Sequence, residues 1–179
     1  MKTIYAFLLL IMPFAGKAQN LQSALDTYFQ FMKESNHEAL IDMSYLVKID
    51  STAKEFYLDM LSGAEEEGVK LSITQVDVLN TPKIVEDESR KFCRVKLKST
   101  SAIDFSEELS ETEIKDVIEM YKYGFPNITY QADLRRANYK TYTSMLGIYE
   151  EGKWFFVEEM TYSLGLLDDV LQEEIYDQL

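Results

Sequence analysis

Residues 139–160 read YKTYTSMLGIYE, EGK and WFFVEEM, and this stretch predicts a long β-hairpin. Its two arms are rich in Tyr, Thr, Phe, Val and Ile, which suit the pleated surface of a strand. Gly152 stands where the chain must reverse, and glycine readily adopts the positive φ that hairpin turns need. The second arm is apolar at each of residues 154–157, so we expect other elements to cover both of its faces.

The residues before the sheet have the 3.6-residue period of amphipathic helices. We expect one helix over residues 20–34, a second over about 37–47 and a third over about 52–66. The third helix has a defined start, because Thr52 and Glu55 match the first and last positions of a capping box.

The period changes from 3.6 to 2 after Gly68, which predicts strands. Residues 69–78 alternate between apolar and polar, but the parity switches near Thr74, where a β-bulge would keep the apolar side chains on one face. Polar residues 86–89 then predict a turn into a long strand over residues 90–105. The apolar side chains of this strand share one parity: Cys93, Val95, Leu97, Ile103 and Phe105.

The opposite face of the long strand carries a basic row, which consists of Arg90, Arg94, Lys96 and Lys98. This row has two interpretations. It is either a docking surface for an anion or the solvated face of a strand beside acidic neighbours. We favour the solvated face, because charged side chains commonly occupy the open faces and edges of sheets.

Two further elements flank the hairpin in sequence. Ser110 and Glu113 match a second capping box, so we expect an inserted helix with Gly124 as its C-cap, followed by a short strand over residues 128–131. After the hairpin, residues 166–179 predict a tail of one or two helical turns. The apolar side of this tail comprises Leu167, Val170, Leu171, Ile175 and Leu179.

The N-terminal segment matches a secretory signal peptide, with Lys2, an apolar run over residues 4–14 and small residues before a cut after Ala18. The apolar run is about half as long as a membrane-spanning helix requires, which disfavours an anchor. We therefore expect residues 1–18 to be removed. Residues 19–179 should then form a single domain in the periplasm or outside the cell.

The chain is acidic, with a formal net charge of −13, and removal of Lys2 and Lys17 makes the charge −15. Such a surface repels nucleic acid and anionic lipid headgroups, so we expect neither as a partner. Cys93 is the single cysteine, which excludes an internal disulfide. Its place on the apolar face of a strand predicts a buried thiol with a structural role.

This order of elements, with helices before a strongly bent antiparallel sheet and an aromatic strand near the end, resembles the NTF2-like (cystatin-like α+β cone) superfamily, in particular small secreted bacterial members. The residues that carry the resemblance are 36–43 (NHEALIDM), 68–73 (GVKLSI) and 152–158 (GKWFFVE). The resemblance implies an α+β fold in which N-terminal helices pack on a cone-shaped sheet. The inserted helix and the C-terminal helical tail are additions to that cone. The fold hosts many functions, so it does not define one here.

The sequence contains no recognisable pattern of catalytic, ligand-binding or metal-ligating residues. Enzymes of the superfamily place an Asp, His or Tyr set inside the cone, and no such set can be matched to this chain. The single histidine, His37, lies at a helix–helix junction, where we interpret it as a capping or surface residue. The acidic runs 65–67 and 86–88 lack the spaced oxygen ligands of a calcium loop, so we expect no metal and no cofactor.

Tyrosine is unusually frequent, with 12 in the chain, and Tyr139, Tyr142, Tyr149 and Tyr162 fall in or near the hairpin. Tyrosine rings either line a ligand cavity or an interface, or they simply cover a sheet. We favour the second interpretation, because tyrosine is a common strand residue.

These observations lead us to expect a non-enzymatic binding module whose partner is a small apolar ligand or a protein. The alternative is a small-molecule isomerase or dehydratase that uses acid–base chemistry in the cone cavity. A buried carboxylate that faces tyrosine hydroxyls across an open cavity would favour the enzyme. We expect a monomer rather than a homodimer, because the inserted helix and the tail can cover the second face of the hairpin.

The signal-peptide interpretation predicts that the exported protein starts at Gln19 or Asn20. N-terminal sequencing or the intact mass of the exported product measures this directly. An exported, membrane-bound product that retains residues 1–18 would contradict the prediction.

Overall fold

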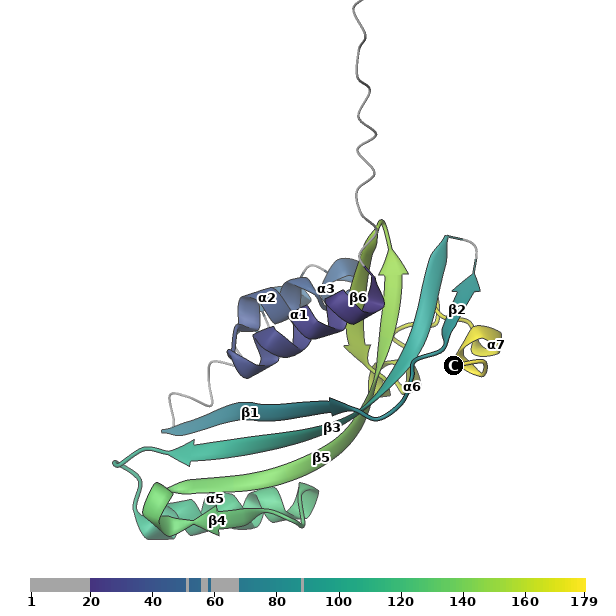
Figure 1. Cartoon of the computed structure of the whole chain (residues 1–179). Helices are drawn as coiled ribbons and strands as arrows, with labels where there is room; N and C mark the ends of the chain where they lie inside the picture. Colours follow the sequence, from purple (N-terminus) through teal and green to yellow (C-terminus); the bar gives the residue numbers. More distant parts are fainter. Residues whose placement is uncertain (1–19, 51, 56–57, 59–67, 88) are drawn as a thin grey trace, which may run out of the picture.

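A computed structural model describes residues 20–50, 52–55, 58, 68–87 and 89–179 (Figure 1). The predicted signal peptide and most of the third predicted helix lie outside the described residues. The described chain is an α+β fold in which helices cover the faces of a six-stranded antiparallel sheet. No helix in these ranges combines the length and the apolar character that crossing a membrane requires.

Helix α1 (Leu21–Lys33) confirms the first predicted helix. The side chain of Asn20 caps it by accepting a hydrogen bond from the backbone N–H of Ser23 (2.8 Å), which satisfies one of the free donors of the first turn. Its buried stripe, which includes Leu25 and Phe29, faces the sheet.

The second predicted helix, over residues 37–47, was wrong in its extent. The chain forms two short helices there, α2 (His37–Asp42) and α3 (Tyr45–Ile49). The break between them docks on the sheet, where the backbone N–H of Phe156 donates to the carbonyl of Met43 (2.8 Å). This hydrogen bond replaces one that a continuous helix would have made. It joins residues far apart in the sequence, so the periodicity of the apolar residues does not predict it.

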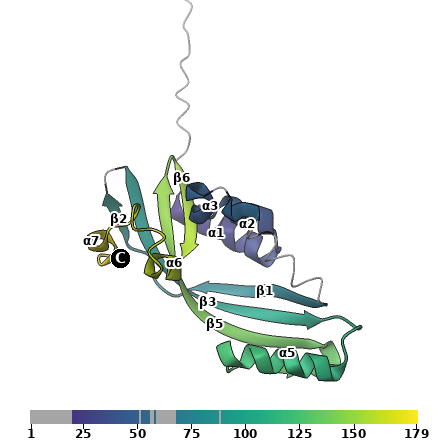
Figure 2. The ribbon, with the colours of Figure 1, turned by 180° about the vertical axis from the view of Figure 1, so that it is seen from behind.

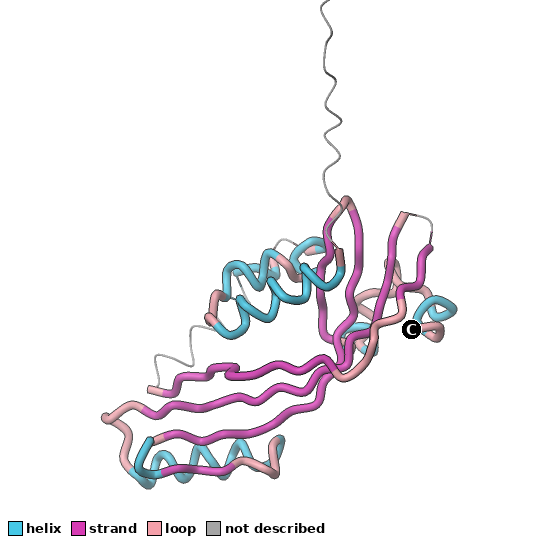
Figure 3. The backbone as a smooth tube through the Cα atoms, in the orientation of Figure 1, coloured by secondary structure: helices cyan, strands magenta, loops and turns pink. Residues whose placement is uncertain are grey.

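Two long strands form the centre of the sheet, β3 (Arg90–Phe105) and β5 (Arg136–Glu150). Their pairing is continuous from Lys91 opposite Tyr149 to Asp104 opposite Arg136. Both strands change direction near their middle, which gives the sheet two halves at an angle to each other (Figures 1 and 3). The flanking strands are β2 (Ile84–Asp87) and β6 (Lys153–Glu158) in the half that contains the hairpin, and β1 (Val69–Val78) and β4 (Thr129–Gln131) in the far half.

Most strand predictions are confirmed, including the bounds of β3 and a short strand that became β4. The register of β1 shifts between Ile73 and Gln75, where the parity switch predicted a bulge. Two predictions were wrong. Residues 84–87 form strand β2 rather than only leading into a turn, and β5 begins at Arg136 instead of Tyr139.

The hairpin of β5 and β6 reverses as predicted, with positive φ angles of 54° at Glu151 and 85° at Gly152. Trp154 and Phe156 are buried against α1 on one face of β6. Val157 is buried on the other face, against the C-terminal tail. The prediction that both faces of this strand are covered is therefore confirmed.

The chain after β6 contains α6 (Met160–Ser163) and α7 (Glu173–Tyr176), and we extend the term tail to this whole segment, residues 159–179. The tail lies behind the hairpin half of the sheet in Figure 1 and in front of it in Figure 2, with α7 beside β2. Leu167 and Leu171 of the tail are almost completely buried on the hairpin. These contacts place the tail on the second face of the hairpin, as the sequence predicted.

The inserted helix α5 (Glu111–Gly124) has the predicted capping box between Ser110 and Glu113. However, it does not cover the hairpin. Its buried residues Ile114 and Ile118 pack on the far half of the sheet, against Ile103, Phe105 and Ala137. The expectation that α5 shares the second hairpin face with the tail was wrong, because its apolar stripe reaches only the far half. Gly124 is the last residue of α5 rather than its cap.

The closed end of the hairpin is held by ion pairs around Glu150, whose side chain is 17% exposed. Its carboxylate lies 2.9 Å from Lys48 Nζ and 2.8 Å from Arg90 Nε, and it accepts a hydrogen bond from the Tyr45 hydroxyl (3.2 Å). Burial by itself raises the pKa of Glu150. The hydrogen bond from Arg90 and the nearby positive charges of Lys48 and Arg90 outweigh this effect and leave the pKa below its ordinary value.

We predict that Trp154→Ala lowers the free energy of unfolding by about 3–5 kcal/mol, because it opens a cavity beneath α1. Equilibrium urea unfolding measures the change. Tyr142→Ala is the matched control, because Tyr142 is 71% exposed and its truncation should change stability by only about 0.5 kcal/mol. A loss below about 1 kcal/mol at Trp154 would contradict the packing of this core.

Glu150→Gln should lower the free energy of unfolding by about 1–3 kcal/mol at neutral pH, because Arg90 loses its anionic partner and Lys48 is left with the exposed carboxylate of Glu151, 3.0 Å from its Nζ. The folded-state pKa of Glu150 is depressed, so its stabilising effect is complete above the unfolded pKa of about 4.3 and disappears as the pH falls through the folded pKa. The free energies of unfolding of the wild type and of Glu150→Gln should therefore converge at low pH. Urea unfolding of both proteins at several pH values measures this.

The control for this experiment is Glu151→Gln, which removes the same charge from a side chain that is 79% exposed. This variant should stay close to the wild type at every pH. If Glu150→Gln lowers the free energy of unfolding equally at pH values above and below the pKa of Glu150, the ion-pair explanation is wrong.

Candidate functional site

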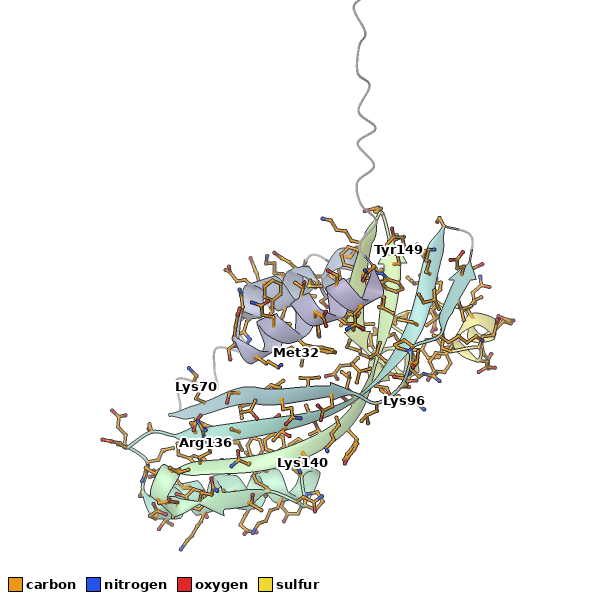
Figure 4. The ribbon with its side chains drawn as sticks, in the orientation of Figure 1. Met32, Lys70, Lys96, Arg136, Lys140 and Tyr149 are labelled. Carbon is orange, nitrogen blue, oxygen red and sulfur yellow. The ribbon has the colours of Figure 1, made fainter. Side chains whose placement is uncertain are left out.

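The described residues form an open groove where the sheet bends, with a volume of about 660 Å³. The middle of β5, the end of β6 and the start of the tail are its walls. We term it the bend groove. Figure 4 places Lys96 beside the bend and Lys140 further along β5 towards α5. Its lining includes Leu79, Lys96, Tyr142, Glu158, Glu159, Met160 and Tyr176.

Large apolar side chains in the bend groove are open to solvent. Leu79 is 52% exposed, Tyr142 is 71% exposed and Met160 is 64% exposed. They come from three separate parts of the chain and line the same hollow. Exposed apolar surface that gathers in one place commonly marks an interaction site.

The tail wall of the groove is held by a cluster of Arg94, Glu159 and Tyr176. Arg94 Nε lies 2.7 Å from Glu159 Oε1, and the Tyr176 hydroxyl donates to the same oxygen (2.6 Å). The Arg94 guanidinium also lies 4.5 Å from the centre of the Tyr176 ring, which in turn stacks on Tyr162 at 3.9 Å. These contacts fix the wall and neutralise the charge of Glu159.

The same cluster sets the protonation of Tyr176. The hydrogen bond to Glu159, together with burial, raises the pKa of the Tyr176 hydroxyl above its ordinary value, although the Arg94 charge opposes this. The hydroxyl therefore stays protonated at neutral pH and acts as a hydrogen-bond donor rather than as a base.

One wall of the groove is an unpaired stretch of β5. Strand β4 pairs with residues 136–138 and β6 pairs with residues 145–150, while the N–H of Glu159 adds one bond to the carbonyl of Ser144 (3.0 Å). Backbone groups alternate in direction along an antiparallel strand, so those of Lys140 and Tyr142 point to the same side as those of Ser144, away from β3.

No group among the described residues hydrogen-bonds these backbone N–H and C=O groups of Lys140 and Tyr142. We term residues 139–144 the free edge of β5. A second hollow of about 350 Å³ lies at its other end, and Tyr142 lines both hollows. The free edge therefore runs from one hollow to the other.

The basic row on β3 separates into two parts. Arg90 pairs with Glu150, and Arg94 pairs with Glu159, as the interpretation of acidic neighbours predicted. Lys96 and Lys98 have no carboxylate oxygen within 4.0 Å among the described residues. This half of the row lies beside the free edge, because Lys96 is opposite Ser144 and Lys98 is opposite Tyr142.

The residues that the sequence singled out lie elsewhere. Cys93 is completely buried, and burial raises the pKa of its thiol to about 12, which confirms a structural position. His37 is the first residue of α2, and its Nδ1 contacts no hydrogen-bond partner in the described ranges. Of the acidic runs, 65–67 lies outside the described residues, whereas Glu86 and Asp87 belong to β2. Among the described residues, no His, Cys, Asp or Glu group of three or more could hold a metal ion.

The tyrosines that the sequence singled out do not all have the same surroundings. Tyr139 packs on Phe125 with ring centres 4.4 Å apart, and Tyr149 packs on Trp154 at 5.3 Å, so these two cover the sheet. Tyr142 and Tyr176 line the bend groove instead. The sequence contained one signal for the free edge, which is that the first arm of the hairpin is much longer than the second.

The fold and the groove together define an α+β protein with an open sheet edge beside an apolar hollow. No family model matches the sequence, and searches of curated proteins and solved structures give no significant match. The function is therefore inferred from the chemistry of the groove.

Proposed function

We propose that this protein is an exported, non-enzymatic binding protein that takes up an extended segment of a partner protein at the free edge of β5. The observation that carries the proposal is the set of main-chain groups of Lys140 and Tyr142, which have no partner among the described residues. Tyr142 lines the bend groove, and both residues line the second hollow. An exposed strand edge pairs readily with an incoming strand, which gains affinity from main-chain hydrogen bonds and specificity from its side chains.

The size of the free edge suits a short segment. Residues 139–144 span about 20 Å at roughly 3.3 Å per residue, so a partner strand of about six residues fits between β4 and β6. The apolar side chains of Leu79 and Met160 lie in the adjoining hollow, where they can contact a partner residue. The neighbouring ends of β4 and β6 limit the segment to this length.

The enzyme alternative has less support from the groove. Glu159 is neutralised by Arg94, and Tyr176 keeps its proton at neutral pH because its pKa is raised. The groove thus presents hydrogen-bond donors and apolar surface, which favour binding over acid–base chemistry.

Three wider proposals accompany this function. Export is supported by the signal-peptide pattern of residues 1–18. A monomer is supported by the tail, because Leu167 and Leu171 occupy the hairpin face that an apolar dimer contact would use. Membership of the NTF2-like superfamily, with a cone-shaped sheet, is supported by the order of N-terminal helices and bent antiparallel strands and remains a prediction.

The proposal predicts that a phage library of random linear heptapeptides yields clones that bind the wild-type protein and lose binding to Tyr142→Pro. Proline at residue 142 removes an outward N–H without breaking the pairing with β3, as proline does at sheet edges. The matched control is Tyr142→Thr, which removes the ring but keeps the N–H, and it should retain most clones. Phage titres after selection on each variant measure the result.

Circular dichroism and thermal unfolding establish that the variants are folded. Selected clones that bind Tyr142→Pro as well as they bind the wild type would show that strand addition at this edge is not how the protein binds peptides.

A further inference from the structure

We propose that the partner segment is acidic, with carboxylates at alternate positions that face a lysine cluster beside the free edge. This inference rests on the proposed strand addition and names the chemistry of the partner. The lysine cluster consists of Lys96 and Lys98 on β3 and Lys140 on β5.

The lysine cluster has no paired carboxylates among the described residues, although the chain carries more acidic than basic side chains. The net charge is −13, yet none of the three lysines has a carboxylate oxygen within 4.0 Å among the described residues. The nearest acidic position across the sheet from Lys98 is Asp77, whose carboxylate accepts hydrogen bonds from Gln75 Nε2 at 2.9 and 3.0 Å. Uncompensated cations in an acidic protein point to an anionic partner.

The three lysines share one face of the sheet. Residues directly opposite each other in an antiparallel pair project to the same side of the sheet. Lys98 is opposite Tyr142 and Lys96 is opposite Ser144, while Lys140 is opposite Thr100, which has the parity of Lys96 and Lys98. The cluster therefore lies on the face that carries the exposed ring of Tyr142. Figure 4 shows Lys96 and Lys140 at the two ends of this region.

A strand added to the free edge would alternate its side chains between the two faces of the sheet. Partner residues opposite Lys140 and Tyr142 project to the lysine face, and the residues between them project to the other face, beside Thr141 and Thr143. Lys140 is then an immediate neighbour of the partner. Lys96 and Lys98 lie about two strand spacings away, roughly 10 Å, which long lysine and glutamate side chains bridge. A segment that alternates carboxylates with small or β-branched residues would place its carboxylates on the lysine face and its other residues beside the threonines.

A second copy of the chain fits the edge less well than an acidic partner. Pairing two free edges would add the Lys140 side chain of one copy to the lysine face of the other and bring like charges together. It would also join two molecules that each carry a charge of −13. An acidic segment instead gains favourable contacts from the cluster, although Glu158 of β6 also lines the bend groove and opposes an anion at that end of the edge.

The test uses the full chain and fluorescence anisotropy with a labelled peptide of about seven residues that alternates glutamate with valine and threonine. Its isostere carries glutamine at every glutamate position. We expect the glutamate peptide to bind about tenfold more tightly at low salt, because two or three exposed ion pairs form. The advantage should shrink as added salt shortens the Debye length.

Protein variants identify the lysines responsible. The double variant Lys96→Gln/Lys140→Gln should bind the two peptides about equally. The matched control is Lys115→Gln/Lys153→Gln, which removes the same charge from exposed lysines on α5 and at the start of β6. It should keep most of the preference for glutamate.

Peptide N-methylation distinguishes strand addition from attraction between charges. Methyl groups on the backbone nitrogens that face β5 should abolish binding, whereas the same number on the alternate nitrogens should be tolerated, because antiparallel backbone groups alternate in direction.

The outcomes separate this inference from the proposed function. Equal affinity of the glutamate and glutamine peptides, with both lost in Tyr142→Pro, would overturn the acidic preference and leave strand addition intact. Equal binding of the two N-methyl isomers would overturn strand addition and the inference with it. Failure of the glutamate peptide to bind, while peptides selected from the phage library do bind the free edge, would overturn the acidic preference alone.

Discussion

The pairing of β3 with β5 is the constraint on which the rest of the structure depends. The ladder is continuous over most of both strands, and a two-stranded ribbon of this length twists strongly. The neighbouring strands follow only parts of it, so each half of the sheet has its own pair of flanking strands. On the β5 side, β4 and β6 leave a gap between them. The free edge is thus a direct consequence of a long twisted ribbon with short neighbours.

The two halves are stabilised by largely different contacts, although Val76 of β1 in the far half also packs against the core beneath α1. The hairpin half is enclosed between α1 and the tail, and the far half is covered by α5. The bend groove lies where the tail wall, held by Arg94 and Glu159, meets the unpaired part of β5. Its walls are therefore supported by the cores on either side, while the edge itself has no strand on it. A binding site of this kind combines a rigid frame with open main-chain groups.

The basic side chains of this acidic protein fall into two groups with different surroundings. Buried or half-buried cations such as Arg90 and Arg94 hold the hairpin and the tail through Glu150 and Glu159. The lysines beside the free edge have no such role among the described residues. Since an acidic surface discourages non-specific contact with anions, a local basic cluster provides a selective site for an acidic segment.

The sequence by itself determined the elements that local patterns control. Alternation defined β3 and the bulge in β1, the capping box defined the start of α5, and Gly152 defined the hairpin turn. The two apolar faces of β6 also predicted correctly that the tail would be needed as a cover. Each of these features depends on residues that are close together in the chain, so a single sequence contains the necessary information.

Only the tertiary structure decided the split between α2 and α3, the position of α5 and the existence of the free edge. The split depends on a hydrogen bond from distant Phe156, and the position of α5 depends on which half of the sheet its stripe reaches. The free edge depends on where β4 and β6 stop along β5. The basic row looked uniform in sequence, and long-range pairing divided it into structural arginines and open lysines. Contacts between distant segments are set by packing and register, which local periodicity does not encode.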